Sequence, residues 1–191
     1  LNLEPGDEVI VPGFTFTSTA TAFVQRNATV VFADIDPVTL NIDPDHVESL
    51  ITDRTRAISI VHYAGVACDL DRFVEIAKRN NLTLIEDNAH GFGGTYKGQN
   101  LGSIGDMATL SFHGTKNIQC GEGGALVINN KDYLQRAEII REKGTNRKEF
   151  QSGIVEKYKW VDKGSSYLMN EVTSAVLLGQ LENFEQIQNA R

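Results

Sequence analysis

The sequence predicts an α/β fold, a three-layer αβα architecture built around a mostly parallel central sheet. Strand patterns and helix patterns alternate along most of the 191 residues, which is typical of consecutive βαβ units. Several strand patterns are continuous apolar runs, such as Ala57–Val61. Runs of this kind are typical of parallel strands that helices cover on both faces.

Turn and cap signals separate the elements. Pro5-Gly6-Asp7 forms a turn before the first strand, because these residue types favour tight turns. Asp43 followed by Pro44 suits a helix N-cap and first helical position. The predicted strands are Glu8–Val11, Thr29–Ala33, Ala57–Val61, Leu82–Ile85, Met107–Phe112 and Ala125–Ile128. The predicted helices are Thr17–Arg26, Asp43 to about Ile51, Asp69–Asn80 and about Lys131–Lys143.

The last third of the chain has a different pattern. Glu142–Ser166 is polar, carries charges of both signs and lacks a hydrophobic period, so we expect a long loop there. Apolar residues return on a broad helical face from Tyr167 to Phe184, which predicts a final helix.

Composition restricts the class of protein. Apolar residues make up 41% and charged residues 23%, with only four prolines, which favours a folded globular chain over a disordered one. The net charge of −7 argues against nucleic acid or an anionic membrane as the main partner. No apolar run reaches the roughly 20 residues of a membrane span. Cys68 and Cys120 lie far apart and form no disulfide framework, so we expect a cytoplasmic protein.

Ten of the 17 glycines fall between Gly91 and Gly124. Glycine permits positive φ and close backbone approach, so the cluster suggests a chain packed against a ligand, with a hairpin turn at 96–98 explaining part of it. Neither Gly-x-Gly pair is followed by the third small residue of a dinucleotide fingerprint, and no GxxxxGK[ST] run occurs. A Rossmann dinucleotide site or a P-loop is therefore unsupported.

Four polar residues lie where predicted strands end. Asp87 ends an apolar strand, and His90 follows it. Ser111 lies near the end of the next strand, and Lys116 comes soon after. Because ligands bind at the carboxyl ends of strands in open α/β sheets, we expect these groups to share one site. Each residue also has a simpler explanation. Asp87 could be a helix N-cap, His90 a structural histidine, Ser111 a residue that only fills the strand, and Lys116 a surface lysine.

A lysine paired with an aspartate suits a particular cofactor. A lysine amine can form a Schiff base with an aldehyde, and pyridoxal phosphate needs a carboxylate opposite its ring nitrogen. At about 4 Å and an effective dielectric near 20, that charge pair interacts by roughly 4 kcal/mol. Ser111 and glycine-rich turns can supply donors to the phosphate. The sequence therefore favours a pyridoxal phosphate site.

Two other chemistries fit less well. Glu86, Asp87 and His90 could share a metal ion, but no second ligand cluster accompanies them, so we expect no metal centre. A serine hydrolase needs a GxSxG elbow, which the sequence lacks.

The chain resembles the DegT/StrS group of nucleotide-sugar aminotransferases, which are fold-type-I enzymes dependent on pyridoxal phosphate. The similarity runs across nearly the whole chain, in the order and spacing of that family. The motifs that carry it are Pro5–Pro12, Phe14-Thr15-Phe16, Val61-His62-x-x-Gly65, Glu86–His90, Tyr96-Lys97-Gly98, Gly102–Asp106, Ser111–Lys116 and Gly121–Gly124.

The resemblance implies a role for each candidate residue. Lys116 would be the Schiff-base lysine and the general acid/base of the proton shift, and Asp87 would face the pyridinium nitrogen. His90, where many members have glutamine, would lie near the cofactor ring and its 3-oxygen. Ser111 would bind the phosphate, and Phe16 matches the aromatic residue that stacks on the ring. Some members replace the lysine with histidine and become dehydratases, so the presence of Lys116 favours transamination.

Within the family, the run Gly164–Leu168 looks like that of the dTDP-4-amino-4,6-dideoxygalactose transaminases of enterobacterial common antigen synthesis. This implies transfer of an amino group from glutamate to a 4-keto-6-deoxy nucleotide sugar, for cell-surface polysaccharide synthesis. Ser166 stands where many relatives have an asparagine that reaches the cofactor phosphate of the partner subunit. We expect the loop Glu142–Ser166 to shape sugar specificity.

The resemblance also implies that residues 1–191 form the central part of a cofactor-binding large domain. An N-terminal segment would precede Leu1, a small domain would follow Arg191, and the protein would be a homodimer with shared active sites. Two alternatives stay open: a non-catalytic relative that binds the cofactor or a nucleotide sugar, and another fold-type-I enzyme such as a lyase.

Overall fold

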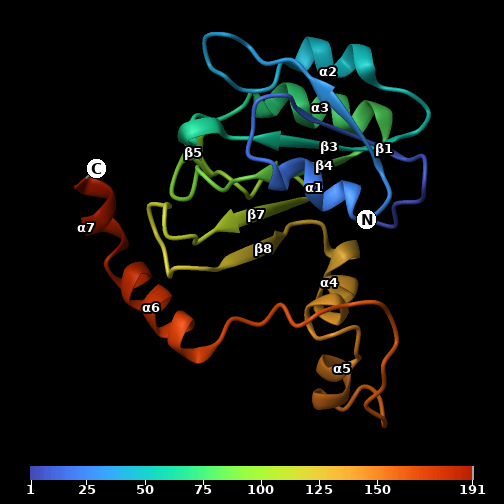
Figure 1. The fold of residues 1–191 in the computed structure, drawn as a ribbon, viewed down its shortest axis with the longest axis vertical. Coiled ribbons are helices and arrows are strands. Elements are labelled where there is room, and N and C mark those ends of the chain that lie inside the picture. The colour runs from blue at the N-terminus through green and yellow to red at the C-terminus, as the bar shows by residue number, and fades with distance from the viewer. Residues whose placement is uncertain (191) are drawn as a thin grey trace.

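A six-stranded sheet forms the centre of the computed structural model, which describes residues 1–190 (Figure 1). All neighbouring strands pair in parallel except the last two, which are antiparallel. This arrangement confirms the predicted α/β class with a mostly parallel sheet. The strand order across the sheet is β2 (Thr29–Ala33), β1 (Glu8–Pro12), β3 (Thr55–Val61), β4 (Thr83–Asp87), β7 (Met107–Ser111) and β8 (Gly124–Ile128).

Helices cover both faces of the sheet, as the apolar strands predict. Helices α2 (Pro44–Leu50) and α3 (Leu70–Asn80) lie side by side over one face (Figure 1). Helix α1 (Ser18–Val24) packs on the other face. Successive strand residues point to opposite faces, so Ile10 joins the first layer while Val9 joins the second. The result is a three-layer αβα architecture.

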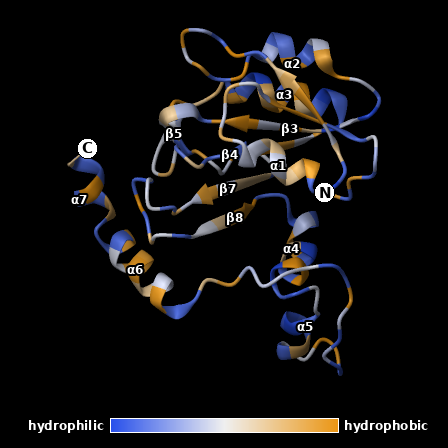
Figure 2. Ribbon diagram, in the orientation of Figure 1, coloured by the Kyte–Doolittle hydropathy of each residue, from blue (hydrophilic) through white to orange (hydrophobic). Residues whose placement is uncertain are grey.

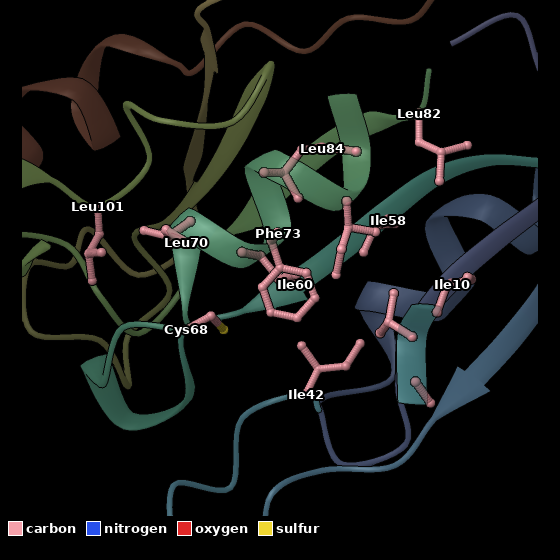
Figure 3. Packing of buried hydrophobic residues seen from close by; sticks show 14 residues of the cluster. Ile10, Ile42, Ile58, Ile60, Cys68, Leu70, Phe73, Leu82, Leu84 and Leu101 are labelled. Carbon is pink, nitrogen blue, oxygen red and sulfur yellow. The ribbon is translucent and has the colours of Figure 1, made fainter. Parts of the chain in front are cut away.

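Phe73 of α3 lies at the centre of the larger core. It is fully buried, and Figure 3 shows its ring among isoleucine and leucine side chains from the strands beneath. Burying each such side chain stabilises the fold by about 1.5–3 kcal/mol. Figure 2, coloured by hydropathy, shows hydrophobic residues concentrated in the central strands. The other labelled residues of this cluster are Ile10, Ile42, Ile58, Ile60, Cys68, Leu70, Leu82, Leu84 and Leu101.

Local sequence signals set the ends of the helices on the first face. The Asp43 carboxylate accepts a hydrogen bond from the N–H of Asp45, and Pro44 takes the first helical position of α2. Asp69 accepts from the N–H of Arg72 at the start of α3. These side chains satisfy N–H groups that the first turn of a helix leaves without partners.

The predicted turn at 96–98 is a two-residue hairpin between β5 (Thr95–Tyr96) and β6 (Gln99–Asn100). Lys97 and Gly98 have φ of 50° and 82°, and two consecutive positive φ values are typical of a type I′ turn.

The segment Glu142–Ser166, predicted to be a long loop, contains more regular structure than expected. Isolated bridges join Glu142 to Ser166 and Thr145 to Trp160. A short helix, α5 (Arg147–Gln151), lies inside the segment. The buried Asn146 side chain donates to the carbonyl of Lys157 at 3.0 Å and accepts from the N–H of Lys159 at 2.7 Å. The side-chain amide of Asn146 therefore ties the start of this segment to the residues 157–159 near its end.

The helices around this segment are shorter than predicted. Lys131–Tyr133 is a 3-10 turn, and α4 follows as Leu134–Arg141. The final helix does not begin at Tyr167. It begins as α6 (Glu171–Glu182), because the Asn170 side chain accepts from the N–H of Thr173 and caps it there. A break at Asn183 separates α6 from α7 (Phe184–Asn189).

Candidate active site

The carboxyl ends of β1 and β3 form the topological switch point of the sheet. The chain leaves β1 for β2 on one side and returns to β3 on the other, and open α/β sheets bind ligands in the crevice at such a point. Phe14 follows β1 and Tyr63 follows β3, and their ring centroids lie 4.6 Å apart across this crevice. Aromatic residues therefore line the edge at which open α/β sheets bind their ligands.

A cavity of about 290 Å³ opens at this edge, near the lower end of the roughly 300–1,000 Å³ typical of ligand pockets. Three of the predicted site residues line it together: His90, Ser111 and Lys116. Ser111 is the last residue of β7, while His90 follows β4 and Lys116 follows β7. The complete lining is Tyr63, Ala64, Ala89, His90, Phe92, Ser111, Thr115, Lys116, Asn117 and Ile118.

Asp87 lies beside the cavity rather than on its wall. Its Oδ2 accepts a hydrogen bond from the Thr19 hydroxyl at 2.7 Å, and its Oδ1 accepts from the N–H of Ala89 at 3.2 Å. The charges of both Asp87 and Lys116 act on His90, which places the acid, the imidazole and the amine in one electrostatic neighbourhood. No helix begins at Asp87, so the N-cap explanation of this residue is wrong.

His90 has a defined tautomer. Its Nδ1 accepts a hydrogen bond from the N–H of Ala64 at 3.3 Å, so the neutral ring carries its proton on Nε2. Burial and the nearby Lys116 ammonium lower the pKa of His90 below its ordinary value, and the Asp87 carboxylate opposes them. At neutral pH, His90 is therefore a neutral side chain that can donate a hydrogen bond through Nε2.

Phe16 is 74% exposed and is not part of the cavity wall. Its carbonyl accepts a hydrogen bond from the N–H of Thr19 at 3.1 Å, so Phe16 is linked to Asp87 through Thr19. Phe14, which the resemblance gave no role, is the aromatic that packs on Tyr63.

Glu86, weighed as a metal ligand from the sequence, is fully buried and serves the fold. Its Oε2 accepts from His62 Nε2 at 2.9 Å and the Gly102 N–H at 2.8 Å. Its Oε1 accepts from the N–H groups of Ile104 at 2.9 Å and Gly105 at 2.6 Å. His62 Nδ1 accepts from a backbone N–H, so its Nε2 carries the proton and donates. Burial alone would raise the pKa of Glu86, but these hydrogen bonds outweigh it and lower that pKa.

The glycine cluster serves the protein's own side chains more than the sequence suggests. The N–H groups of Gly102 and Gly105 point to Glu86 and not to a ligand. At Gly91, a Cβ would lie 2.2 Å from Asn88 Oδ1, and at Gly93 it would lie 2.5 Å from the Phe184 ring. Close packing within the chain therefore explains Gly91 and Gly93, while Gly102 and Gly105 serve Glu86 through their N–H groups.

Several residues of the site were not found from the sequence. Tyr63, Phe92, Thr115 and Thr19 carry no catalytic signature, but Tyr63 follows the end of a strand just as His90 does. Applying the carboxyl-end rule to every strand, and not to titratable residues alone, would have indicated Tyr63. Within residues 1–190, no three His, Cys, Asp or Glu side chains gather so as to hold a metal ion. Across the same residues, no helix has the length and apolar character needed to cross a bilayer.

The chemistry of this donor set fits pyridoxal phosphate. Lys116 has the amine that an aldehyde needs, Asp87 has a carboxylate that can pair with a ring nitrogen, and His90 can donate an N–H. The hydroxyls of Ser111 and Thr115 line the same cavity and can donate to a phosphate. The fold and the donor set together suit an α/β protein with room for an aldehyde cofactor at the carboxyl edge of its sheet.

Comparison with known proteins gives the family. The family model described as "DegT/DnrJ/EryC1/StrS aminotransferase family" matches residues 1–191. The chain belongs to this family, whose cofactor is pyridoxal phosphate.

The similarity extends to individual proteins. The chain is 40% identical to GDP-perosamine synthase of Caulobacter vibrioides over 191 residues, which is 100% of this chain and 50% of that protein. PseC, a Helicobacter pylori aminotransferase of pseudoaminic acid biosynthesis, superposes with a TM-score of 0.85 at 30% identity, covering 94% of this chain and 47% of PseC. Spr1654 of Streptococcus pneumoniae, solved in PLP and PMP forms, gives TM-scores of 0.83 and 0.84 at 30% identity, covering 95% of this chain and about half of that one. The chain thus spans about half the length of the curated relatives it matches.

Proposed function

We propose that the protein transfers an amino group to a keto group of a nucleotide-linked sugar. The observation that carries this proposal is the meeting of Lys116, His90 and Ser111 in one cavity, with Asp87 beside it. The relatives support it, since one is named GDP-perosamine synthase and another takes part in pseudoaminic acid biosynthesis. When bound, pyridoxal phosphate supplies the electron sink and carries the amino group between donor and acceptor.

The residues of this chain divide the work. Lys116 Nζ would hold the cofactor through its aldehyde and would serve as the general acid and base that moves a proton. Asp87 would favour the protonated ring nitrogen through its negative charge. His90 would donate through Nε2 to an oxygen at the cofactor ring, Ser111 would donate to the phosphate, and Phe16 would supply the aromatic side chain for stacking on the ring.

Glutamate is the amino donor in this proposal, and a 4-keto-6-deoxy nucleotide sugar is the acceptor. The particular product proposed is a dTDP-4-amino-4,6-dideoxyhexose, of the kind made by dTDP-4-amino-4,6-dideoxygalactose transaminases, for a cell-surface polysaccharide. The support for this finer assignment is the resemblance of the run Gly164–Leu168. A panel of dTDP- and GDP-linked 4-keto-6-deoxy sugars, each with glutamate, tests it. Faster amination of the GDP sugar would overturn the dTDP assignment and leave the transaminase proposal standing.

We also propose that residues 1–191 are the central part of a large domain that works as a homodimer. The apolar side chains of α6 support this, because Val172 and Leu178 are 77% and 58% exposed, and exposed apolar patches mark interaction surfaces. Sedimentation of the full-length protein tests the dimer, and a monomer that is fully active would overturn it.

The decisive experiment replaces Lys116. In the full-length protein, Lys116→Ala should abolish the visible absorption band of the lysine-bound cofactor and all amino transfer. Borohydride should fix the cofactor onto the peptide that contains Lys116 in the wild-type protein. Lys78→Ala, at an exposed position on α3, is the matched control and should change neither.

Two results would contradict the proposal. Full turnover by Lys116→Ala would remove the lysine from the chemistry. A wild-type protein that binds the cofactor but transfers no amino group to any sugar would favour a non-catalytic relative.

A further inference from the structure

The buried hydroxyl of Thr19 is joined to Asp87 across 68 positions of sequence. Thr19 is 5% exposed and lies in the first turn of α1. Its Oγ1 lies 2.7 Å from Asp87 Oδ2 and 2.8 Å from the Thr15 hydroxyl. These contacts connect the loop after β1 to the carboxylate at the end of β4.

The proton positions in this chain of groups follow from hydrogen-bonding capacity. A carboxylate only accepts, so Thr19 must give its single hydroxyl proton to Asp87. Thr19 then has no proton left for Thr15, so Thr15 donates to Thr19. The hydrogen bonds therefore run in one direction, from Thr15 to Thr19 to Asp87.

The two threonines also bracket Phe16. The N–H of Thr19 donates to the carbonyl of Phe16 at 3.1 Å, which closes the turn that presents the exposed Phe16 ring. The segment that carries this aromatic side chain is thus fastened to the carboxylate through Thr19.

We propose that Thr19 is a positioning residue that fixes the direction of the Asp87 carboxylate and couples it to the Phe16 segment. The N–H of Ala89 holds Oδ1 and the Thr19 hydroxyl holds Oδ2, so together they set the plane of the carboxylate. Functional groups need this kind of support, because a carboxylate free to turn meets its partner in the productive geometry only part of the time. The inference rests on the proposed function, since the partner of Asp87 is the cofactor ring nitrogen.

The test compares threonine variants of the full-length protein by their affinity for pyridoxal phosphate. Thr19→Val keeps the shape of the side chain and removes the hydroxyl, while Thr19→Ser keeps the hydroxyl. Thr21→Val is the matched control, because Thr21 lies exposed on the same helix and its hydroxyl bonds only to the Thr17 carbonyl at 2.9 Å.

We expect Thr19→Val to weaken cofactor binding about tenfold, the usual effect of losing one hydrogen bond to a charged group. Thr19→Ser and Thr21→Val should bind like the wild type. Thr15→Val removes only the hydroxyl that donates to Thr19, and it should weaken binding by less than Thr19→Val. The pH at which the bound cofactor changes its absorption should move in Thr19→Val and stay unchanged in Thr21→Val.

A double-mutant cycle separates positioning from general damage to α1. If Thr19 acts through Asp87, then adding Thr19→Val to Asp87→Asn should weaken binding little further. Full additivity of the two changes would overturn the inference, and so would equal cofactor affinities for Thr19→Val and Thr21→Val. If Thr19→Val does not fold, the cofactor affinities of Thr15→Val and Thr21→Val are compared instead. Equal affinities of these two variants would then overturn the inference. Failure of the wild-type protein to bind the cofactor would instead overturn the proposed function.

Discussion

Replacing Glu86 by glutamine probes the polar network that holds the loop 101–106 against β4. The carboxylate accepts four hydrogen bonds, two on each oxygen, at 2.6–2.9 Å. Glutamine has the same shape, but one of its two terminal atoms is an NH₂ group. Whichever way the amide lies, two of the four N–H groups then face a donor instead of an acceptor.

The size of the effect follows from these contacts. A buried donor left unpaired costs about 1–3 kcal/mol, so two of them cost about 2–6 kcal/mol. Removing a buried charge returns part of this, because an ionised carboxylate is itself costly to bury. We therefore expect Glu86→Gln to lower the free energy of unfolding by about 3 kcal/mol. His62 cannot relieve the clash by changing tautomer, because its Nδ1 already accepts from the N–H of Cys68 at 3.2 Å.

Urea unfolding of the full-length protein measures this change, with Glu75→Gln as the control. Glu75 lies exposed on α3, and its nearest cation, Arg79, is 3.8 Å away, so its replacement should change stability by less than about 0.5 kcal/mol. The hydrogen bonds that lower the pKa of Glu86 stabilise the fold above the ordinary glutamate pKa, and that stabilisation is lost as pH falls through the lowered value. The difference in the free energy of unfolding between the wild type and Glu86→Gln should therefore become smaller at acid pH. Equal unfolding midpoints for the Glu86 and Glu75 variants at neutral pH would refute the reasoning.

Three further changes test other parts of the structure. The pKa of His90 is lowered in the fold, so the free energy of unfolding should rise with pH from that lowered value up to about 6.5. His90→Gln should remove this rise from urea midpoints measured across pH. An unchanged pH profile in the variant would contradict the prediction. Gly93→Ala should cost more stability than Gly98→Ala, since both have positive φ, of 87° and 82°, but only at Gly93 would a Cβ meet the ring of Phe184; equal losses would show that α7 does not pack there. Asn146→Ala should release the segment 157–159 and raise KM for the sugar while cofactor affinity stays constant; an unchanged KM would separate this segment from sugar binding.

Much of the fold could be predicted from the sequence because its signals are local. Apolar runs gave the strands within a few residues, and Asp43 and Asp69 mark helix starts by their own side chains. Asn170 carries the same signal, but the apolar pattern that begins at Tyr167 predicts an earlier start. The cap side chain decides where α6 starts, and the hydrophobic residues 167–169 lie outside any helix.

The candidate site could be predicted only in part. The strand-end rule brings His90, Ser111 and Lys116 to one edge, and the cavity there contains all three. The pairing of Thr19 with Asp87 joins residues 68 positions apart, and that of His62 with Glu86 joins residues 24 apart. Such pairs depend on the packing of α1 and the loop 101–106 against β4, which no periodicity reveals. Position Phe16 is matched by resemblance alone, since its ring is exposed.

The adjacent carboxylates of β4 show how one strand supports both fold and chemistry. Successive side chains of a strand point to opposite faces, so Glu86 turns toward the loop 101–106 while Asp87 turns toward Thr19 of α1. A shift of the strand by one residue would exchange the two and place the wrong carboxylate on each face. The four hydrogen bonds to Glu86 oppose such a shift. They therefore help to fix the register of β4 and the position of Asp87 at its end. Loss of the Glu86 network should therefore reduce cofactor affinity as well as stability. Loss of the Thr19 hydroxyl should act mainly on the affinity, because the register of β4 does not depend on it.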